Sequence, residues 1–211
     1  MKKLLIALLT VALCMSFAAC GGDKESTTVA GTTAAATTTV AATTENVPAE
    51  DITPDVEAGT IGAIHWDAFV KFVNENPAAT AEEIANAVLF VEADGAPVNQ
   101  FFGGVVPVDA SWEFYNGFGE EFKMGEYKTG AMYGPMMGSI AYIGYIFELE
   151  EGADTAAFIE NLTANCNPRW QICVTADQTL AGNVGNKVFF LMCPSTYEMP
   201  PEVFEGGMAL D

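Results

Sequence analysis

The sequence predicts an α+β domain: a two-layer sandwich whose small antiparallel sheet contains a β-α-β-β unit and is preceded by two helices. Two observations favour this fold class. Residues 64–91 carry apolar side chains at helical spacing, in two stretches separated by Asn76-Pro77. Residues 139–193 then hold β-branched and aromatic runs, one helical stretch and a hairpin pattern. Elements in this order are expected to place the helices on one face of the sheet.

The first 19 residues predict an export signal. Lys2 and Lys3 precede a largely apolar run over residues 4–13, and small residues lead up to Cys20. The run is too short to span a bilayer, which takes about 20 apolar residues. With Cys at the first mature position, the stretch resembles the lipobox of bacterial lipoproteins, although Phe17 stands where that motif usually has Leu. The resemblance implies cleavage before Cys20 and lipid on that residue.

The segment after the signal, residues 20–54, is expected to be the lipidated Cys followed by a disordered tether. Thr and Ala dominate it, and it has neither aromatic residues nor apolar periodicity, so burial cannot offset the entropy of ordering it. The tether would hold a globular domain, residues 55–193, away from the membrane. Residues 194–211 are acidic, contain Pro200-Pro201 and are expected to form a loose tail.

The two helices of the domain are recognised by their apolar faces and their ends. The apolar face of the first helix consists of Ile64, Phe69, Phe72 and Val73. The second opens at a capping box, in which Thr80 and Glu83 each satisfy the other's free backbone N–H. Its apolar face consists of Ile84, Val88 and Val91, and Asp94-Gly95 ends the unit.

The second half of the domain holds the sheet. Residues 96–138 are rich in Gly and aromatic residues and predict only short strands and turns. Ser139–Leu149 is the clearest strand, and large apolar residues at most of its positions indicate that both faces are covered. Asp154 can cap a helix that reaches Asn165, with an inward face of Phe158, Ile159 and Leu162.

Three further strands are expected after this helix. The first covers residues 170–175. The other two, residues 179–184 and 187–193, form a hairpin around Gly185-Asn186.

Composition excludes some partners. The chain has 8 basic and 28 acidic residues; without residues 1–19, which hold two Lys and no acid, 6 basic and 28 acidic residues leave a net charge of −22. We expect no nucleic-acid partner, because binding to phosphates requires Lys and Arg. A cationic partner or divalent ions would be attracted, although solubility is the simpler explanation of the charge.

Parts of the chain resemble small domains of unknown function in lipoproteins of Gram-positive gut anaerobes. The matching motifs are Asn116-Gly117-Phe118, Gly134-Pro135-Met136-Met137-Gly138-Ser139-Ile140, Gly144-Tyr145-Ile146-Phe147-Glu148, Arg169-Trp170 and Gly185-Asn186-Lys187-Val188-Phe189-Phe190. They contain packing and turn residues and no catalytic signature. The resemblance therefore implies a surface location and a compact domain, and no activity.

No motif predicts a cofactor, a metal site or a catalytic centre. His65 is the only histidine and is expected on a helix surface or in an N-terminal contact, because no serine sits in a nucleophile elbow. Cys166, Cys173 and Cys193 have no C-x-x-C spacing and are expected to be buried free thiols. The paired acids Glu82-Glu83, Glu120-Glu121 and Glu148 with Glu150-Glu151 are expected to be solvated, although such pairs can hydrolyse glycosides across a cleft.

The aromatic segment 101–147 is the one candidate ligand surface. Trp112, Phe118, Tyr127 and Tyr133 could stack on a sugar or peptide, but filling of the core is the favoured explanation of so many large side chains. We expect a non-enzymatic cell-surface lipoprotein, a small binding or interaction module on a flexible stalk. The alternatives are a cell-envelope hydrolase with an acidic pair and a recruiter of solute or protein for a membrane machine. The expected partners are the membrane, through the lipid on Cys20, and a cell-envelope protein or glycan.

Overall fold

The structure, a computed structural model, describes residues 50–137 and 140–197. The predicted signal peptide, Cys20, most of the tether and the tail after Tyr197 lie outside these residues. The described helices are α1 (Ile61–Glu75), α2 (Ala81–Leu89) and α3 (Thr155–Asn165). The strands are β1 (Glu92–Ala93), β2 (Ala96–Pro97), β3 (Gly103–Val108), β4 (Thr129–Pro135), β5 (Ile143–Glu148), β6 (Gln178–Val184) and β7 (Lys187–Cys193).

The main sheet has the strand order β3-β4-β5-β7-β6, and every neighbouring pair is antiparallel. Strands β1 and β2 form a separate ribbon, whose turn residues Asp94 and Gly95 both have positive φ angles. The predicted α+β class is confirmed, and so is the β-α-β-β unit, which is β5-α3-β6-β7. The two preceding helices are α1 and α2.

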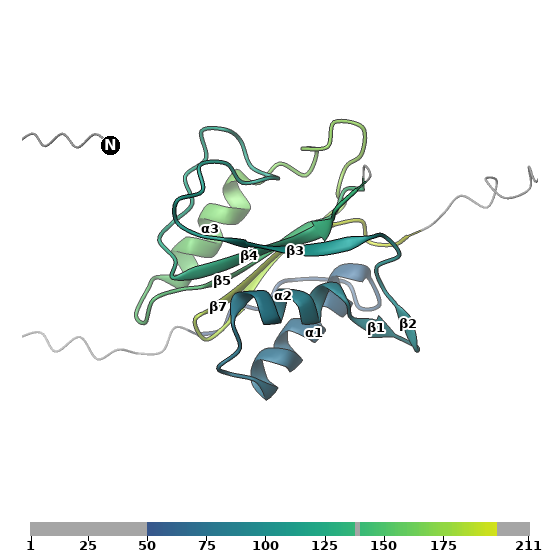
Figure 1. Cartoon of the computed structure of the whole chain (residues 1–211), viewed down its shortest axis with the longest axis horizontal. Helices are drawn as coiled ribbons and strands as arrows, with labels where there is room; N and C mark the ends of the chain where they lie inside the picture. Colours follow the sequence, from purple (N-terminus) through teal and green to yellow (C-terminus); the bar gives the residue numbers. More distant parts are fainter. Residues whose placement is uncertain (1–49, 138–139, 198–211) are drawn as a thin grey trace, which may run out of the picture. The chain divides into compact units, whose positions relative to one another are not determined.

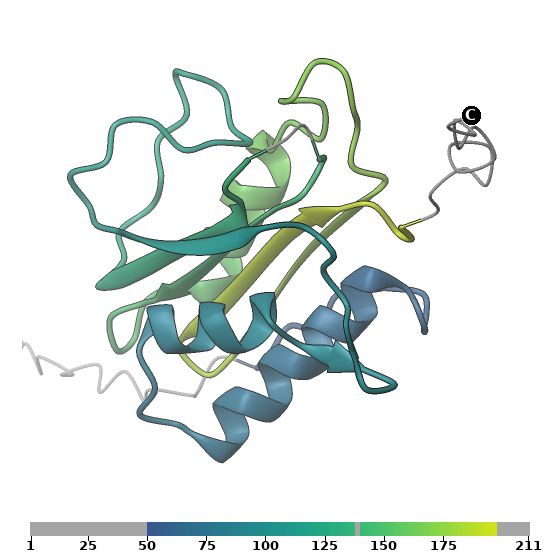
Figure 2. The ribbon, with the colours of Figure 1, turned by 45° about the vertical axis from the view of Figure 1, so that its right-hand side comes forward.

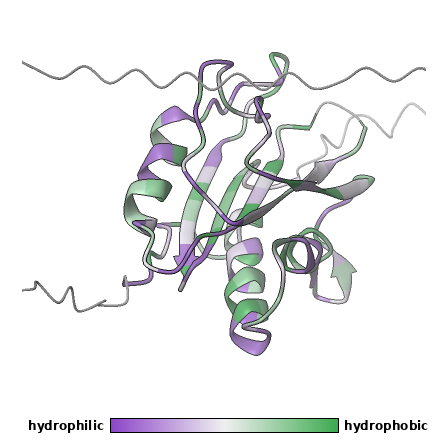
Figure 3. Cartoon of the chain, turned by 60° about the vertical axis from the view of Figure 1, so that its left-hand side comes forward, coloured by the Kyte–Doolittle hydropathy of each residue, from purple (hydrophilic) through white to green (hydrophobic). Residues whose placement is uncertain are grey.

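The two-layer prediction is wrong, because helices cover both faces of the sheet. Helices α1 and α2 pack on one face, and α3 with the long loop before β4 packs on the other (Figures 1 and 2). The physical reason lies in β5 and β7, whose side chains are almost all buried on both faces. A single layer of helices would leave one of these apolar faces in water. Figure 3 shows hydrophobic stretches on the strands and on the helices beside them.

The core on the side of α1 and α2 is formed by alternate residues of the strands. The helices contribute Ile61, Trp66, Phe69, Ile84, Val88 and Leu89. The strands contribute Ala131, Tyr133, Ile146, Phe189 and Leu191. Thr80 caps α2 as predicted, since its backbone N–H donates to Glu83 Oε2 over 2.9 Å and its Oγ1 accepts from the Glu83 N–H over 3.3 Å.

The core on the opposite face joins α3 to the long loop, residues 109–128. Helix α3 begins after Asp154, as predicted, and buries Phe158, Ile159 and Leu162. The loop buries Tyr115, Phe118, Phe122 and Tyr127 against the strands, whose contribution includes Tyr145, Phe147 and Phe190. Aromatic residues of this loop therefore cover the part of the sheet beside α3, as a second helix would.

Two strand predictions need correction. The expected strand at residues 170–175 is absent; residues 170–173 form turns and bends, and Ile172 is exposed with a φ angle of 61°. Residues 96–138, expected to be irregular, supply the regular strands β3 and β4. These strands are not predicted because Gly and Pro are unfavourable inside strands. Gly130 is nevertheless suited to its place, where a larger side chain would overlap Val108 and Phe147.

The folded domain extends beyond its predicted ends. Ile52, assigned to the tether, accepts a backbone hydrogen bond from Asn183 over 3.0 Å and donates one to the Asn183 side chain over 2.8 Å. Ser195, assigned to the loose tail, accepts a hydrogen bond from the backbone of Ile61 over 2.9 Å. Residues just outside both predicted boundaries are thus held by hydrogen bonds. They supply partners for backbone groups of the edge strand β6 and of the start of α1.

Gly144 should tolerate no larger side chain. It lies opposite Tyr133 in the β4–β5 pairing, and a Cβ at Gly144 would overlap the ring of this fully buried tyrosine. We expect Gly144→Ala to lower the free energy of unfolding by at least about 2 kcal/mol, as overpacking of a rigid core does. Urea denaturation measures this. Gly119→Ala is the control, since nothing lies within 4 Å of its new Cβ; equal effects of the two variants would contradict the close packing of Tyr133 on Gly144.

Candidate functional site

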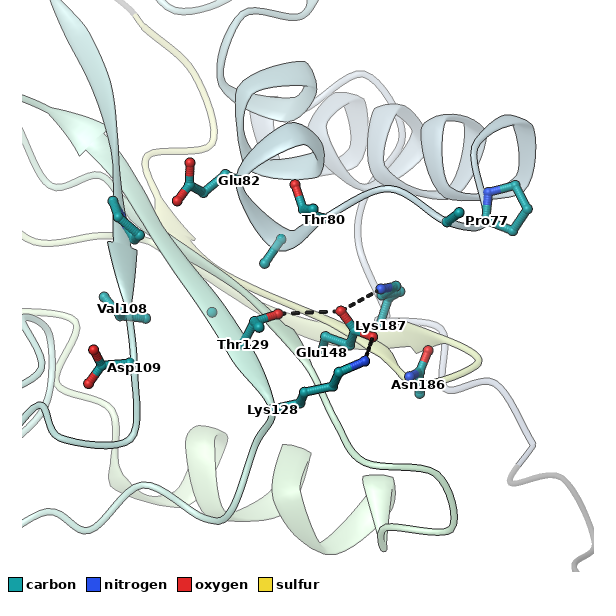
Figure 4. A pocket seen from close by; sticks show the side chains of 14 residues that line it. Pro77, Thr80, Glu82, Val108, Asp109, Lys128, Thr129, Glu148, Asn186 and Lys187 are labelled. Atoms are coloured by element: carbon teal, nitrogen blue, oxygen red, sulfur yellow. Dashed lines mark hydrogen bonds and ion pairs between the residues drawn. The ribbon is translucent and has the colours of Figure 1, made fainter.

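A hollow of about 790 Å³ opens at one end of the main sheet (Figure 4). Here β3 and β5 end, β4 and β7 begin, and the N-terminus of α2 lies opposite them. The hollow is lined by Pro77, Ala78, Thr80, Ala81, Glu82, Pro107, Val108, Asp109, Lys128, Thr129, Gly130, Glu148, Asn186 and Lys187. Side chains from five separate segments therefore meet at this place.

Strand pairing brings the charged residues of the hollow together. Glu148, the last residue of β5, is the direct partner of Thr129 at the start of β4 and of Lys187 at the start of β7. Lys128 precedes β4, and its backbone N–H donates to the Glu148 carbonyl over 2.8 Å. Residues opposite one another in antiparallel strands have neighbouring side chains, so the register alone places the ions within reach.

Two lysines share one carboxylate in this cluster. Lys128 Nζ lies 3.0 Å from Glu148 Oε1, and Lys187 Nζ lies 3.0 Å from Glu148 Oε2. The Thr129 hydroxyl donates to Glu148 Oε2 over 3.3 Å. The side chain of Lys187 is only 8% exposed and that of Glu148 only 16%, whereas Lys128 is 53% exposed. We name these three residues the Glu148 cluster.

The cluster keeps the Glu148 carboxylate ionised. Desolvation raises the pKa of Glu148, but hydrogen bonds and charges from Lys187 and Lys128 outweigh it, so that its pKa lies below the ordinary value. The pKa of Lys128 is raised by its hydrogen bond to Glu148. Burial of a charged pair is costly and often contributes little to stability. The pair of Glu148 and Lys187, largely withdrawn from water and facing a hollow, is therefore a candidate for a functional role.

Two more carboxylates lie across the hollow from the Glu148 cluster. Figure 4 shows Glu82 of α2 and Asp109, which follows β3, on the side away from Lys187. Asp109 accepts hydrogen bonds from the Ser111 side chain and backbone, and these hold its pKa below the ordinary value. Glu82 is exposed in the first turn of α2. The hollow thus has a carboxylate side and a side where the two ammonium groups lie.

The candidate aromatic residues do not form one surface, and three of them fill the core, which was the favoured explanation. Tyr133 is fully buried in the core beneath α1 and α2, while Phe118 and Tyr127 are buried in the core on the other face. Trp112 is half-buried and shares with Tyr127 the edge of a smaller hollow of about 410 Å³. The sheet itself separates these side chains, because Tyr133 points to one face and the other aromatic residues pack on the opposite one.

His65 is fully buried, so its predicted position on a helix surface or in an N-terminal contact is wrong. Its Nδ1 lies 2.6 Å from the Ile61 carbonyl oxygen and its Nε2 lies 3.0 Å from the Asn99 side-chain nitrogen. Asn99 also donates to the Leu89 carbonyl over 2.8 Å and accepts from the Tyr197 hydroxyl over 2.8 Å. His65 is therefore a structural residue that links α1 to the segment after β2, and it is not among the residues that line the hollow.

The remaining candidate residues, the cysteines and the other paired acids, lie outside the hollow. Cys166, Cys173 and Cys193 are free, as predicted, but only Cys193 is buried, and burial raises the pKa of its thiol. Glu120, Glu121, Glu150 and Glu151 are exposed. Within residues 50–137 and 140–197, no group of three potential ligands is placed to hold a metal ion. None of the helices described there is long and apolar enough to cross a membrane.

Neither lysine of the site is predicted from the sequence. Glu148 is expected to be solvated with Glu150-Glu151, but its side chain is only 16% exposed. One signal was present: Lys187 is the only charged residue in the otherwise apolar strand 187–193. A charged residue at the start of such a strand suggests a buried partner.

No protein-family profile, no curated protein and no solved structure matches this chain.

Acid should destabilise the domain through His65. Desolvation lowers the pKa of His65 from 6.5 to about 4, although the hydrogen bond to Ile61 acts in the opposite direction. Between these pH values the unfolded chain binds a proton at His65 that the folded chain excludes, so stability falls as the pH falls. From pH 7 to pH 4 this residue alone should remove about 3 kcal/mol.

The measurement is urea denaturation across this pH range, with His65→Gln as the control. Glutamine does not titrate, so its stability should depend less steeply on pH between 6.5 and 4. Parallel pH profiles for the two proteins would contradict the buried, neutral state of His65.

Loss of Glu148 should leave Lys187 as a buried charge without its partner. We expect Glu148→Gln to lower the free energy of unfolding by about 3 kcal/mol, as removal of one member of a buried pair does. Lys128→Gln is the comparison: Lys128 is 53% exposed, and because an exposed ion pair contributes little, the change should cost far less than Glu148→Gln. Chemical denaturation of both variants tests the difference, and similar losses would show that Lys187 does not depend on Glu148.

Proposed function

We propose that the protein is a non-enzymatic, lipid-anchored protein of the extracellular side of the cell membrane, and that its domain binds a ligand in the hollow beside the Glu148 cluster. One observation carries the binding part of this proposal. Lys187 and Glu148 are largely withdrawn from water at the wall of a hollow of about 790 Å³, a volume in the range of known ligand sites. Such a charged pair holds hydrogen-bonding groups in fixed positions, where a ligand can bind them.

The chemistry of the hollow favours binding over catalysis. A glycosidase needs one carboxyl group that is protonated when it acts. Glu148 and Asp109 both have lowered pKa values, so at neutral pH they are carboxylates that do not donate protons. His65, a potential general base, is enclosed in the core and contacts Asn99 and Ile61. These observations support a binding module over the alternative of a hydrolase with an acidic pair.

The location part of the proposal is supported by the sequence alone. The chain begins with Lys2 and Lys3, an apolar run and small residues before Cys20, followed by a Thr/Ala-rich segment. Lipid on Cys20 would supply the anchor, at about 0.8 kcal/mol for each CH₂ group buried in the membrane.

Substitution of Cys20 tests the anchor. In a bacterial host that modifies lipoproteins, the wild-type protein should sediment with membranes and incorporate a labelled fatty acid, and protease added to intact cells should remove it from the surface. Cys20→Ser should abolish the label and move the protein to the soluble fraction. Cys173→Ser is the matched control, since it removes an exposed thiol elsewhere. Membrane retention of the Cys20→Ser protein would refute lipid anchoring at this residue.

A further inference from the structure

We infer that the hollow recognises a short peptide with a free amino group and a free carboxyl group; this inference rests on the proposed function. The carboxyl group would meet Lys128 beside Glu148, and the amino group would meet Glu82 and Asp109 across the hollow (Figure 4).

On the cationic side, Lys128 has donors to spare. An ammonium group carries three N–H donors, and the described structure assigns one of those of Lys128 to Glu148, over 3.0 Å. The Lys128 side chain is 53% exposed, so its other donors face the hollow or solvent. Glu148 cannot neutralise both lysines, because it shares one negative charge between them. This end of the site therefore has an excess positive charge that attracts a carboxylate.

On the opposite side, two carboxylates would attract a cationic group. Glu82 and Asp109 are both exposed and lie on different segments, α2 and the loop after β3. Counted with Glu148 and the two lysines, the hollow's lining has a net charge of −1, within a chain whose net charge is −20. The surrounding field repels a simple anion. A ligand that carries one positive and one negative charge avoids this repulsion and satisfies both sides.

The space between the charged sides selects for a molecule longer than one amino acid. The hollow of about 790 Å³ lies near the upper part of the range for small-molecule sites, roughly 300–1,000 Å³. Pro77, Ala78, Pro107 and Val108 also line the hollow and offer apolar contact to the body of the ligand. A peptide of two to four residues, with its charges at its two ends, has the chemistry that this arrangement would recognise.

Isothermal titration calorimetry of the full-length protein with Ala-Ala-Ala tests the inference. The free tripeptide should bind, and either N-acetylation or C-terminal amidation should weaken binding at least tenfold. Lys128→Gln should weaken binding of the free tripeptide at least tenfold and leave the affinity for the amidated peptide unchanged. Glu82→Gln should act on the free tripeptide but not on the acetylated one, because the charge it recognises is then missing.

Lys71→Gln and Glu160→Gln are the matched controls, since both residues are exposed and lie outside the lining of the hollow. They should leave binding unchanged. The inference is overturned if the capped and free peptides bind alike, if the controls weaken binding as much as Lys128→Gln, or if Ala-Ala-Ala produces no binding heat at about millimolar concentration.

Titration with chitotriose, an uncharged oligosaccharide, separates the inference from the proposed function. If Ala-Ala-Ala fails and chitotriose binds in a manner that Asn186→Ala or Glu82→Gln weakens, the hollow is a ligand site and the peptide assignment is wrong. If neither probe binds, the peptide assignment is wrong and the hollow loses its proposed role. Binding of chitotriose that none of the substitutions in the hollow affects would place the ligand site elsewhere and overturn both proposals.

Discussion

The structure depends on two adjacent strands, β5 and β7, that are apolar on both faces. Their paired residues, such as Tyr145 with Phe190 and Ile146 with Phe189, alternate between the two sides of the sheet and are fully buried. Water must therefore be excluded from both sides at once, because apolar area of this size is strongly unfavourable in contact with water. The helices α1 and α2 meet this requirement on one face, and α3 with the aromatic loop meets it on the other.

The same pair of strands creates the candidate site where their apolar run ends. Glu148 closes β5 and Lys187 opens β7, so the first charged residues after the buried run face each other across the strand pair. Each residue compensates the charge of the other in a setting where either alone would be costly. Lys128, which precedes β4 and is 53% exposed, joins them and leaves donors available to a ligand. The site is thus a consequence of how the core ends. It brings together two lysines in a chain that has only 8 basic residues.

Local signals in the sequence located several elements correctly. The capping box at Thr80 and Glu83, the cap at Asp154 and the hairpin around Gly185-Asn186 are all determined by neighbouring residues, and all three occur in the structure. The strand predicted at residues 170–175 failed because apolar residues in a short window do not reveal whether a pairing partner exists. Strands β3 and β4 were hidden for the opposite reason: their Gly residues suit close packing with distant side chains.

The candidate site was beyond the reach of local patterns. Lys128, Glu148 and Lys187 are far apart in the chain, and only strand register brings each lysine to 3.0 Å from the Glu148 carboxylate. His65 gives the same lesson, since its neighbours in sequence indicate a helix and its partner Asn99 lies 34 positions away. By itself the sequence determined the helix caps, the hairpin, the α+β class and the apolar nature of both faces of β5, because these depend on residues close together. Tertiary structure alone decided which element covers each face and which charges meet, because these depend on pairing between distant segments.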